Sequence, residues 1–248
     1  MTATDLAEPV ATTQEPHLQR EPLQLLGPDG TYAPSSGLTH GLEDGELQEL
    51  YARMVVTRRV DREIINLQRQ GQVGVYPSCL GQEGAQVGAA AALGSRDWVF
   101  PQYRELGFAL QLGVTPTALA HLWRGTWHLG YDPFEHRYAP ISIPIGTQAL
   151  HAVGYAMGAK LDGVELATVA CFGDGATSTG DVHEALNFAG VYQAPVVFFV
   201  QNNRYAISVP LAQQTAAPTL AHKAIGYGIP ALRCDGNDVL ASYVTTKR

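Results

Sequence analysis

The chain has 248 residues, of which 46% are hydrophobic and 16% are charged, so it carries enough apolar material for one large core. Its net charge of −7 argues against nonspecific binding to nucleic acid, which needs clustered positive charge. No apolar run approaches the roughly 20 residues of a membrane-spanning helix, and residues 1–10 lack the apolar segment of a signal peptide. Three widely spaced cysteines indicate a reducing compartment. We therefore predict a cytoplasmic protein with neither nucleic acid nor a membrane as a partner.

The chain divides into an N-terminal arm and one domain. Residues 1–40 are rich in Pro, Gly, Thr and Gln and show little periodicity, which is typical of an extended or disordered arm outside the core. Residues 41–248 form the predicted domain. Its first helix spans about residues 43–69, where hydrophobic side chains recur at helical spacing and Gly71 follows as a stop signal.

A second helix is predicted over residues 81–93, where Gly and Ala gather near one face. Such a face lets another backbone approach closely, so we expect tight packing inside the domain, with a contact between subunits as the alternative. A short buried strand at residues 97–100 and a helix at residues 116–127 follow. A loop rich in Pro and Tyr then extends to residue 140.

Strands and helices alternate in the second half of the chain. A helix is expected over residues 149–161, and then a strand at 166–172, a helix at 179–189 and a strand at 195–201. Because these strands are apolar on both faces, they predict an α/β fold with a parallel sheet flanked by helices. A helix at 221–228, a strand at 231–234 and a last helix capped by Asp238 complete the prediction. That helix has no stop signal before Arg248, so we expect a truncated polypeptide that lacks the C-terminal part of the domain.

Polar residues follow the two best-defined strands at the point where each ends. Asp174 lies between two glycines after the first strand, and Asn203 comes 29 residues later, after the second. Ligands bind at the carboxyl ends of parallel strands. A carboxylate oxygen of Asp174, the amide oxygen of Asn203 and a carbonyl oxygen such as that of Tyr205 are suitable ligands for Mg²⁺, with diphosphate oxygens completing the shell. A plain Gly-Asp-Gly turn is the alternative.

The same residues carry a resemblance to a known family. GDG at 173–175, followed about thirty residues later by NN at 202–203, resembles the fingerprint of thiamine diphosphate enzymes. The sequence of residues 173–208 is similar to that of the alpha subunit of 2-oxo acid dehydrogenases that work as alpha–beta pairs. GQEG at 81–84, PQYRELG at 101–107 and ISIPIGTQ at 141–148 occur in the family's order. The resemblance covers about residues 42–248 and implies the thiamine diphosphate-binding fold.

The resemblance implies contacts of individual residues with the organic cofactor. Tyr103 and Arg104 match residues that contact its diphosphate, which suits the fork of an arginine. An ion pair of Arg104 with Glu105 or with another surface carboxylate is the alternative for that arginine. Backbone groups of Ile143 and Ile145 would meet the aminopyrimidine ring, and the side chain of Ile145 would hold the cofactor bent. Without the resemblance, both isoleucines would be interpreted as core residues.

Further contacts follow from the same comparison of motifs. Backbone N–H groups of Gly175 and Ala176 would reach the phosphates. Ser142, Thr147 and Gln148 match a potassium site of branched-chain members, although small polar residues in loops often satisfy only nearby backbone groups. One departure is Gln201, because some branched-chain relatives have an arginine before the asparagine pair.

The resemblance implies oxidative decarboxylation of a 2-oxo acid and transfer of the acyl group to lipoyl domains of an acyltransferase. YAIS at 205–208 and ISIPIGTQ favour a branched-chain substrate of the 3-methyl-2-oxobutanoate type, with pyruvate as the alternative. A beta subunit would complete an alpha2beta2 heterotetramer. It would also supply a glutamate that activates the cofactor. A catalytic histidine of the family lies beyond Arg248, so we name no catalytic acid or base in this chain.

Two other classes of protein remain as hypotheses. A nucleotide-binding oxidoreductase would need GxGxxG after a strand, and GDGATS lacks the third glycine at that spacing. A non-catalytic, cofactor-binding fragment is harder to separate from the main prediction, because the chain lacks the histidine loop.

Overall fold

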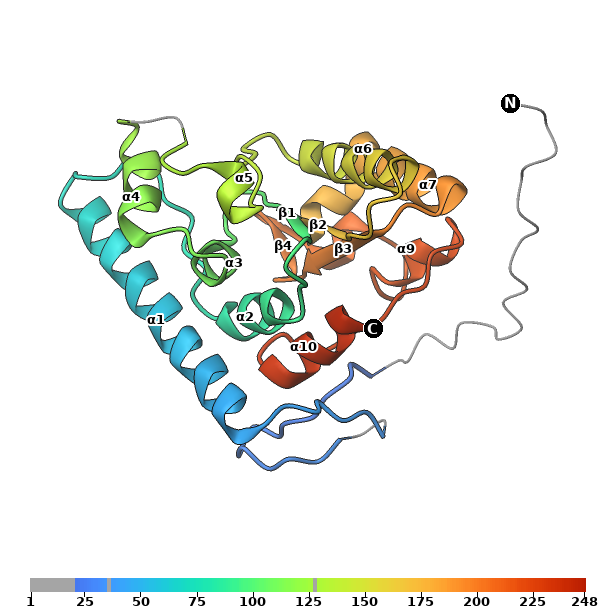
Figure 1. Cartoon of the computed structure of the whole chain (residues 1–248), viewed down its shortest axis with the longest axis horizontal. Helices are drawn as coiled ribbons and strands as arrows, with labels where there is room; N and C mark the ends of the chain where they lie inside the picture. The colour runs from blue at the N-terminus through green and yellow to red at the C-terminus, as the bar shows by residue number, and fades with distance from the viewer. Residues whose placement is uncertain (1–20, 35–36, 127–128) are drawn as a thin grey trace.

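The computed structural model describes residues 21–34, 37–126 and 129–248 and contains a three-stranded parallel sheet between layers of helices (Figure 1). The strands β1 (Trp98–Phe100), β2 (Thr168–Gly173) and β3 (Val196–Gln201) are neighbours in that order. Both pairings are parallel, and Gly173 at the end of β2 lies opposite Gln201 at the end of β3. The predicted α/β fold with a parallel sheet flanked by helices is confirmed.

The helices agree with the sequence prediction where they are long and differ where they are short. Three short helices, each of four to six residues, were not predicted because helical periodicity does not show over so few positions. A 3-10 helix, η1 (Asp174–Ser178), follows β2, and a small antiparallel pair, β4 (Tyr205–Ala206) and β5 (Val209–Pro210), follows β3. In the described residues the helices are α1 (Asp44–Arg69), α2 (Glu83–Ala91), α3 (Leu106–Gln111), α4 (Pro116–Arg124), α5 (Pro133–His136), α6 (Thr147–Leu161), α7 (Gly180–Tyr192), α8 (Leu211–Gln214), α9 (His222–Ile225) and α10 (Val239–Lys247).

The core consists of hydrophobic clusters on both faces of the sheet. Side chains alternate along β2, so Ala170 and Phe172 join the cluster beneath α6 and α7, whereas Val169 and Cys171 join the cluster with α2, α3 and α4. Figure 1 shows α6 and α7 on one side of the strands and α2 and α3 on the other. Burial on both faces explains why the strand sequences are apolar throughout.

The small-residue helix packs against another part of the same chain. A Cβ atom built on Gly88 of α2 would lie 2.3 Å from the carbonyl oxygen of Val239 and 2.9 Å from Cβ of Ser242 in α10. Only a residue without a side chain permits this approach. The prediction of tight internal packing for this helix is confirmed.

The prediction that residues 1–40 lie outside the core is wrong for part of the arm. Leu23 and Leu25 are buried, and Leu25 joins a third hydrophobic cluster with residues of α1, α2 and α10. The backbone of Leu23 pairs with residues 233–235, and both oxygen atoms of the Asp238 carboxylate are engaged, one of them by Leu25 and Leu26. These partners are more than 200 residues away, so local composition did not reveal them. Residues 1–20 lie outside the described residues, and the division into arm and domain stays a prediction.

The C-terminal third also differs from the sequence prediction. The expected strand at 231–234 is a single bridge between Cys234 and Leu23, and the expected helix at 221–228 is reduced to α9. The last helix begins where predicted, because the Asp238 side chain accepts hydrogen bonds from the backbone N–H groups of Leu240 and Ala241. The predicted end of the helix at 116–127 falls at the boundary of the described residues, where α4 ends at Arg124.

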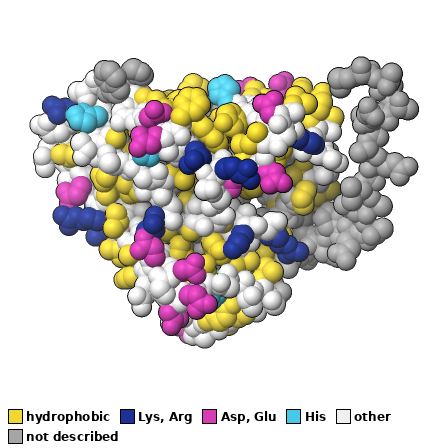
Figure 2. Space-filling view, in the orientation of Figure 1, with side chains coloured by type: hydrophobic (Ala, Val, Ile, Leu, Met, Phe, Trp, Pro, Cys, Tyr) yellow, Lys and Arg dark blue, Asp and Glu magenta, His cyan; other side chains and the backbone are white. Residues whose placement is uncertain are grey.

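The surface of the described residues carries charges of both signs. Figure 2 shows acidic and basic side chains interspersed over one face, with hydrophobic side chains visible between them. Among the described residues, no helix combines the length and the apolarity that a membrane crossing requires.

Candidate functional site

The polar residues singled out after β2 and β3 lie at neighbouring strand ends. Asp174 directly follows β2, and its side chain is almost fully buried, with 1% exposed. Its Oδ2 atom accepts a hydrogen bond of 2.8 Å from the Nε2 group of Gln214. None of the four ion pairs between described residues includes this carboxylate. A buried carboxylate whose hydrogen-bond donor is a neutral amide is costly unless a cation is nearby.

The loop after β3 presents its amides at the surface. Asn203 is exposed, and its Oδ1 atom accepts the backbone N–H of Tyr205 over 3.0 Å. Asn202 forms the same turn with Arg204, which has a left-handed backbone with φ of 69°. An amide oxygen has two lone pairs, so the turn leaves Asn203 able to accept a further ligand.

The two loops are in direct contact. A Cβ atom built on Gly175 would lie 2.7 Å from Cβ of Ala206, so the 3-10 helix after β2 packs against β4 after β3. Glycine is required here by this close approach. The loops that carry Asp174 and Asn203 therefore meet at the carboxyl edge of the sheet, as the strand order predicts.

The motif expected to contact a diphosphate, Tyr103-Arg104, lies in the loop between β1 and α3. The Arg104 guanidinium donates a hydrogen bond to the carbonyl oxygen of Ser78 and lies 5.7 Å from the ring centroid of Tyr103. The alternative, an ion pair of Arg104 with Glu105 or another surface carboxylate, is not seen among the described residues. Instead, the Glu105 carboxylate accepts the backbone N–H groups of Gln102 and Arg104 over 2.9 and 3.0 Å.

Glu105 belongs to a buried polar network that the sequence reasoning missed. It is 3% exposed, and burial raises the pKa of its carboxyl above the ordinary value. Gln201 donates to it over 2.8 Å and accepts from Gln86 over 2.9 Å. The one signal in the sequence is Gln86 itself, a polar residue in the middle of a helix of Gly, Ala and Val.

The two isoleucines assigned to the aminopyrimidine are not core residues. Ile143 is 58% exposed and Ile145 is 42% exposed. Their loop lies against the start of α7, because a Cβ atom on Gly146 would be 2.6 Å from Oγ1 of Thr179. The alternative that these side chains fill the core is therefore wrong, and both remain open to a ligand or a partner.

The residues expected to bind potassium differ in their surroundings: Gln148 has a buried oxygen atom without a partner among the described residues, whereas Ser142 binds a nearby backbone group. Gln148 is buried and donates to the carbonyl oxygen of Cys171 over 2.7 Å, while its Oε1 atom has no hydrogen-bond partner within the part of the chain that the structure describes. The Ser142 hydroxyl donates to the carbonyl oxygen of Pro144 over 3.1 Å, which agrees with the backbone-satisfying alternative. Thr147 is the first residue of α6.

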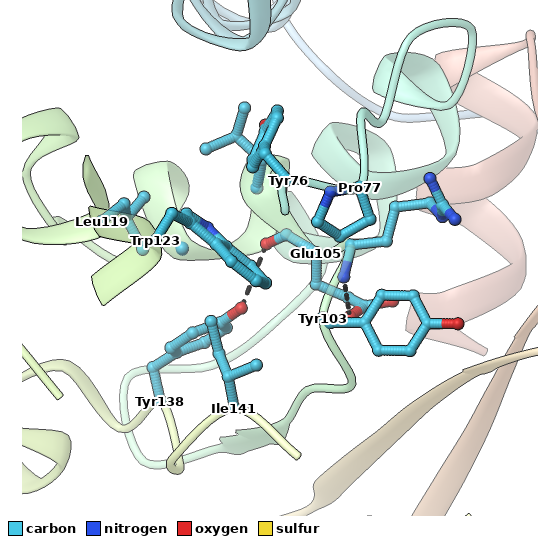
Figure 3. Close-up of a pocket in the computed structure, with 11 residues that line it drawn as sticks. Tyr76, Pro77, Tyr103, Glu105, Leu119, Trp123, Tyr138 and Ile141 are labelled. Atoms are coloured by element: carbon cyan, nitrogen blue, oxygen red, sulfur yellow. Dashed lines mark hydrogen bonds between the residues drawn. The ribbon is translucent and has the colours of Figure 1, made fainter. Parts of the chain in front are cut away.

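A small cavity lies beside Glu105, and its walls include Tyr76, Trp123 and Tyr138 (Figure 3). Figure 3 shows the Tyr138 hydroxyl directed at the backbone of Glu105, where it donates to the carbonyl oxygen over 3.1 Å. The cavity has a volume of about 10 Å³, which accommodates one water molecule at most. It is too small for an organic cofactor. The residues singled out from the sequence lie in the loops after β1, β2 and β3, and these loops form the candidate site.

Comparisons with known proteins identify the family of the chain. The family model of the dehydrogenase E1 component matches residues 51–248, so the chain belongs to that family. It is 58% identical over 223 residues to the 3-methyl-2-oxobutanoate dehydrogenase subunit alpha of Mycobacterium tuberculosis, covering 90% of this chain and 61% of the relative. It is 40% identical over 239 residues to the pyruvate dehydrogenase E1 component subunit alpha of Staphylococcus epidermidis, covering 96% of this chain and 64% of the relative. The chain therefore spans less than two thirds of the length of either relative.

Proposed function

We propose that the chain is most of the alpha subunit of a 2-oxo acid dehydrogenase that binds magnesium–thiamine diphosphate and decarboxylates a branched-chain 2-oxo acid. The observation that carries the cofactor proposal is the buried Asp174 carboxylate, which lacks an ion-pair partner among the described residues. Its loop packs against the segment that follows the asparagine pair after β3. The substrate proposal is supported by the 58% identity to a 3-methyl-2-oxobutanoate dehydrogenase subunit alpha.

The residues present fit a magnesium ion. Asp174 would contribute a carboxylate oxygen, Asn203 the second lone pair of its amide oxygen, and Tyr205 its backbone carbonyl oxygen. Mg²⁺ prefers such hard oxygen ligands and completes its shell with phosphate oxygens and water. A cation at this position would compensate the buried charge of Asp174, which agrees with the lack of an ion pair within the described chain.

The rest of the candidate edge fits a diphosphate and an aromatic ring. Gly175 and Ala176 would direct backbone N–H groups at the phosphates from the start of η1. Tyr103 and Arg104 would contact the same group from the loop after β1, where the guanidinium offers several donors in one plane. Ile143 and Ile145 are exposed and would meet the aminopyrimidine through their backbone groups and an apolar side chain.

Within this function, the chain binds and orients rather than transferring protons. Thiamine diphosphate, when bound, supplies the nucleophilic carbon and the electron sink that decarboxylation requires. Asp174 and Asn203 would fix the metal-bound diphosphate at one end, and Ile145 would hold the rings in a bent conformation. We assign no catalytic acid or base to residues of this chain.

The proposed assembly requires other proteins. A beta subunit would be one of them, because the relatives are named as alpha subunits. The assembly that we propose is an alpha2beta2 heterotetramer. The acyl group would pass to lipoyl domains of an acyltransferase in the cytoplasm. The unpartnered Oε1 atom of Gln148 supports a potassium ion held with Ser142 and Thr147.

Turnover of the complete alpha chain assembled with its beta subunit tests the substrate. We expect a higher kcat/KM for 3-methyl-2-oxobutanoate than for pyruvate. Pyruvate dehydrogenase activity is the second candidate, supported by 40% identity to the Staphylococcus relative, and a strong preference for pyruvate would establish it. Calorimetry with Mg²⁺ and thiamine diphosphate tests the site separately. If the cofactor binds without turnover of either acid, the chain is a non-catalytic binding subunit.

A further inference from the structure

One half-buried side chain, that of Gln201, connects the loop of Arg104 with the end of β3. Gln201 donates from Nε2 to Oε1 of Glu105 over 2.8 Å and accepts at Oε1 from Nε2 of Gln86 over 2.9 Å. The second carboxylate oxygen of Glu105 accepts the backbone N–H groups of Gln102 and Arg104. A single hydrogen-bonded path therefore runs from the end of β3 to the backbone of Arg104.

Gln86 fixes the same loop from the side of α2. Its Nε2 group also donates to the carbonyl oxygen of Arg104 over 2.9 Å, and its Oε1 atom accepts the N–H of Gly107 over 2.8 Å. Gln86 is 0% exposed, and both of its polar atoms have partners. Each hydrogen bond has a defined donor and acceptor, so the orientation of every amide in the network is determined.

Because of its position in the chain, Gln201 links this network to the asparagine loop after β3. Gln201 is the last residue of β3, and Asn202 and Asn203 follow it directly. The carboxylate that it binds holds the backbone N–H of Arg104. The loop that presents the guanidinium and the loop that presents the Asn203 amide are thus joined through one pair of side chains.

We propose that Gln201 is a positioning residue that couples the diphosphate-binding loop at Arg104 to the cation-binding loop at Asn203. The inference rests on the proposed function, because it assigns Gln201 a role in how the chain presents its cofactor contacts. Buried, fully connected polar networks of this kind determine geometry more strictly than apolar packing does.

A rescue experiment tests the hydrogen-bonded path. Gln201→Met removes the donor and the acceptor at similar volume, and we expect the affinity for Mg²⁺–thiamine diphosphate to fall about tenfold, as for the loss of one charge-assisted hydrogen bond. The exchange Glu105→Gln with Gln201→Glu reverses the polarity of the pair and can re-form every bond of the path. We expect this double variant to regain most of the affinity. Gln111→Met, in α3 outside the network, is the matched control and should bind as the original chain does.

A double-mutant cycle shows whether the effect passes through Arg104. We expect Gln201→Met to weaken binding much less in an Arg104→Ala background, because the guanidinium that it positions is then absent. Equal losses in both backgrounds, or no recovery in the exchanged pair, would overturn the inference. All variants are measured by calorimetry in the complete alpha chain assembled with its beta subunit.

Hydrogen exchange gives a readout that does not depend on the cofactor. In the cofactor-free protein, Gln201→Met should increase amide hydrogen exchange at residues 102–104 and at residues 202–206 together. The double variant Glu105→Gln with Gln201→Glu should restore the protection of both segments. If Gln201→Met fails to fold, Gln86→Met tests the same path from its other end. Absence of cofactor binding in the original chain would refute the proposed function. Normal binding in all network variants would refute this inference alone.

Discussion

Gly88 and Val239 lie so close that a Cβ atom on the glycine would be 2.3 Å from the carbonyl oxygen of Val239. These residues belong to α2 and α10, and their contact joins the middle of the chain to its last helix. α2 also carries Gln86, which holds the loop of Arg104. The packing of two helices thus supports the geometry of the candidate site.

This contact predicts the effect of adding one methyl group. Gly88→Ala should lower the free energy of unfolding by about 1–3 kcal/mol, because the backbones of α2 and α10 must separate. Gly154→Ala in α6 is the control, since a Cβ atom there meets nothing within 4 Å. The control should be neutral or up to about 1 kcal/mol more stable, because alanine favours the helix. Urea denaturation measures both, and equal stability of the two variants would contradict the packing.

Neutralising Asp174 should abolish metal binding without lowering the stability of the metal-free protein. The carboxylate is buried and has no ion-pair partner among the described residues. Asp174→Asn should therefore unfold at no lower denaturant concentration than the original chain when metal is absent. With Mg²⁺ and thiamine diphosphate at about 100 times Kd, only the original chain should gain about 2.7 kcal/mol. A similar gain in the variant would place the cation elsewhere.

Truncation of Arg104 should weaken binding of the diphosphate. Arg104→Ala should cost about 1.5–3 kcal/mol of cofactor affinity, the usual worth of a hydrogen bond to a charged group. Arg59→Ala is the control, because Arg59 is exposed on α1 and pairs with Glu63 one helical turn away. Calorimetry should show an affinity for this control within about 0.5 kcal/mol of the original, as for a surface ion pair. Unchanged affinity in Arg104→Ala would show that the diphosphate site lies elsewhere.

The ion pair between the buried Glu83 and the half-exposed Arg58 leads us to predict that stability depends on pH. Burial acts to raise the pKa of Glu83, but hydrogen bonds from Arg58 and from the backbone N–H of Gly81 outweigh it, so the pKa is lowered. A carboxyl with a lowered pKa in the folded state stabilises the protein above its unfolded pKa of about 4.3. This contribution is lost as the pH falls through the folded pKa.

Glu83→Gln should therefore be less stable than the original chain by about 1–3 kcal/mol at pH 7. The difference should shrink as the pH is lowered from about 5 toward 3. Glu63→Gln, in the exposed pair with Arg59, should change stability by less than about 0.5 kcal/mol at either pH. Denaturation at several pH values measures both variants, and a difference that persists at pH 3 would refute the linkage.

Asp238 both caps α10 and binds the backbone of residues 25–26, and we predict that a substitution can remove one of these interactions without the other. Its Oδ1 atom accepts from Leu240 and Ala241, and its Oδ2 atom accepts from Leu25 and Leu26 over 2.6 and 2.7 Å. Asp238→Ala should lose both functions and at least about 1–2 kcal/mol of stability. Asp238→Ser retains one oxygen for the cap, so it should keep most of the stability. It lacks the second oxygen that binds Leu25 and Leu26, so amide hydrogen exchange at residues 23–26 should increase. Unchanged protection of that segment in both variants would contradict the contact.

The sequence by itself determined the elements with a strong local pattern. Long helices such as α1 and α6 show helical periodicity over several turns, and the apolar runs of β2 and β3 identify buried parallel strands. Residues such as Asp174 and Asn203 were found because they directly follow those strands, and ligands bind at that edge in any parallel sheet.

Only the tertiary structure decided how distant residues are paired. Gln86 and Gln201 are separated by 115 positions, and Leu25 and Asp238 by 213. Composition suggested that the segment around Leu25 lies outside the core, whereas α10 buries it. An isoleucine-rich motif looked like core, yet Ile143 is exposed. A local pattern indicates which secondary structure a segment prefers. Burial and hydrogen bonding depend instead on which distant segments the fold brings together. That information is not present in any short stretch of the chain.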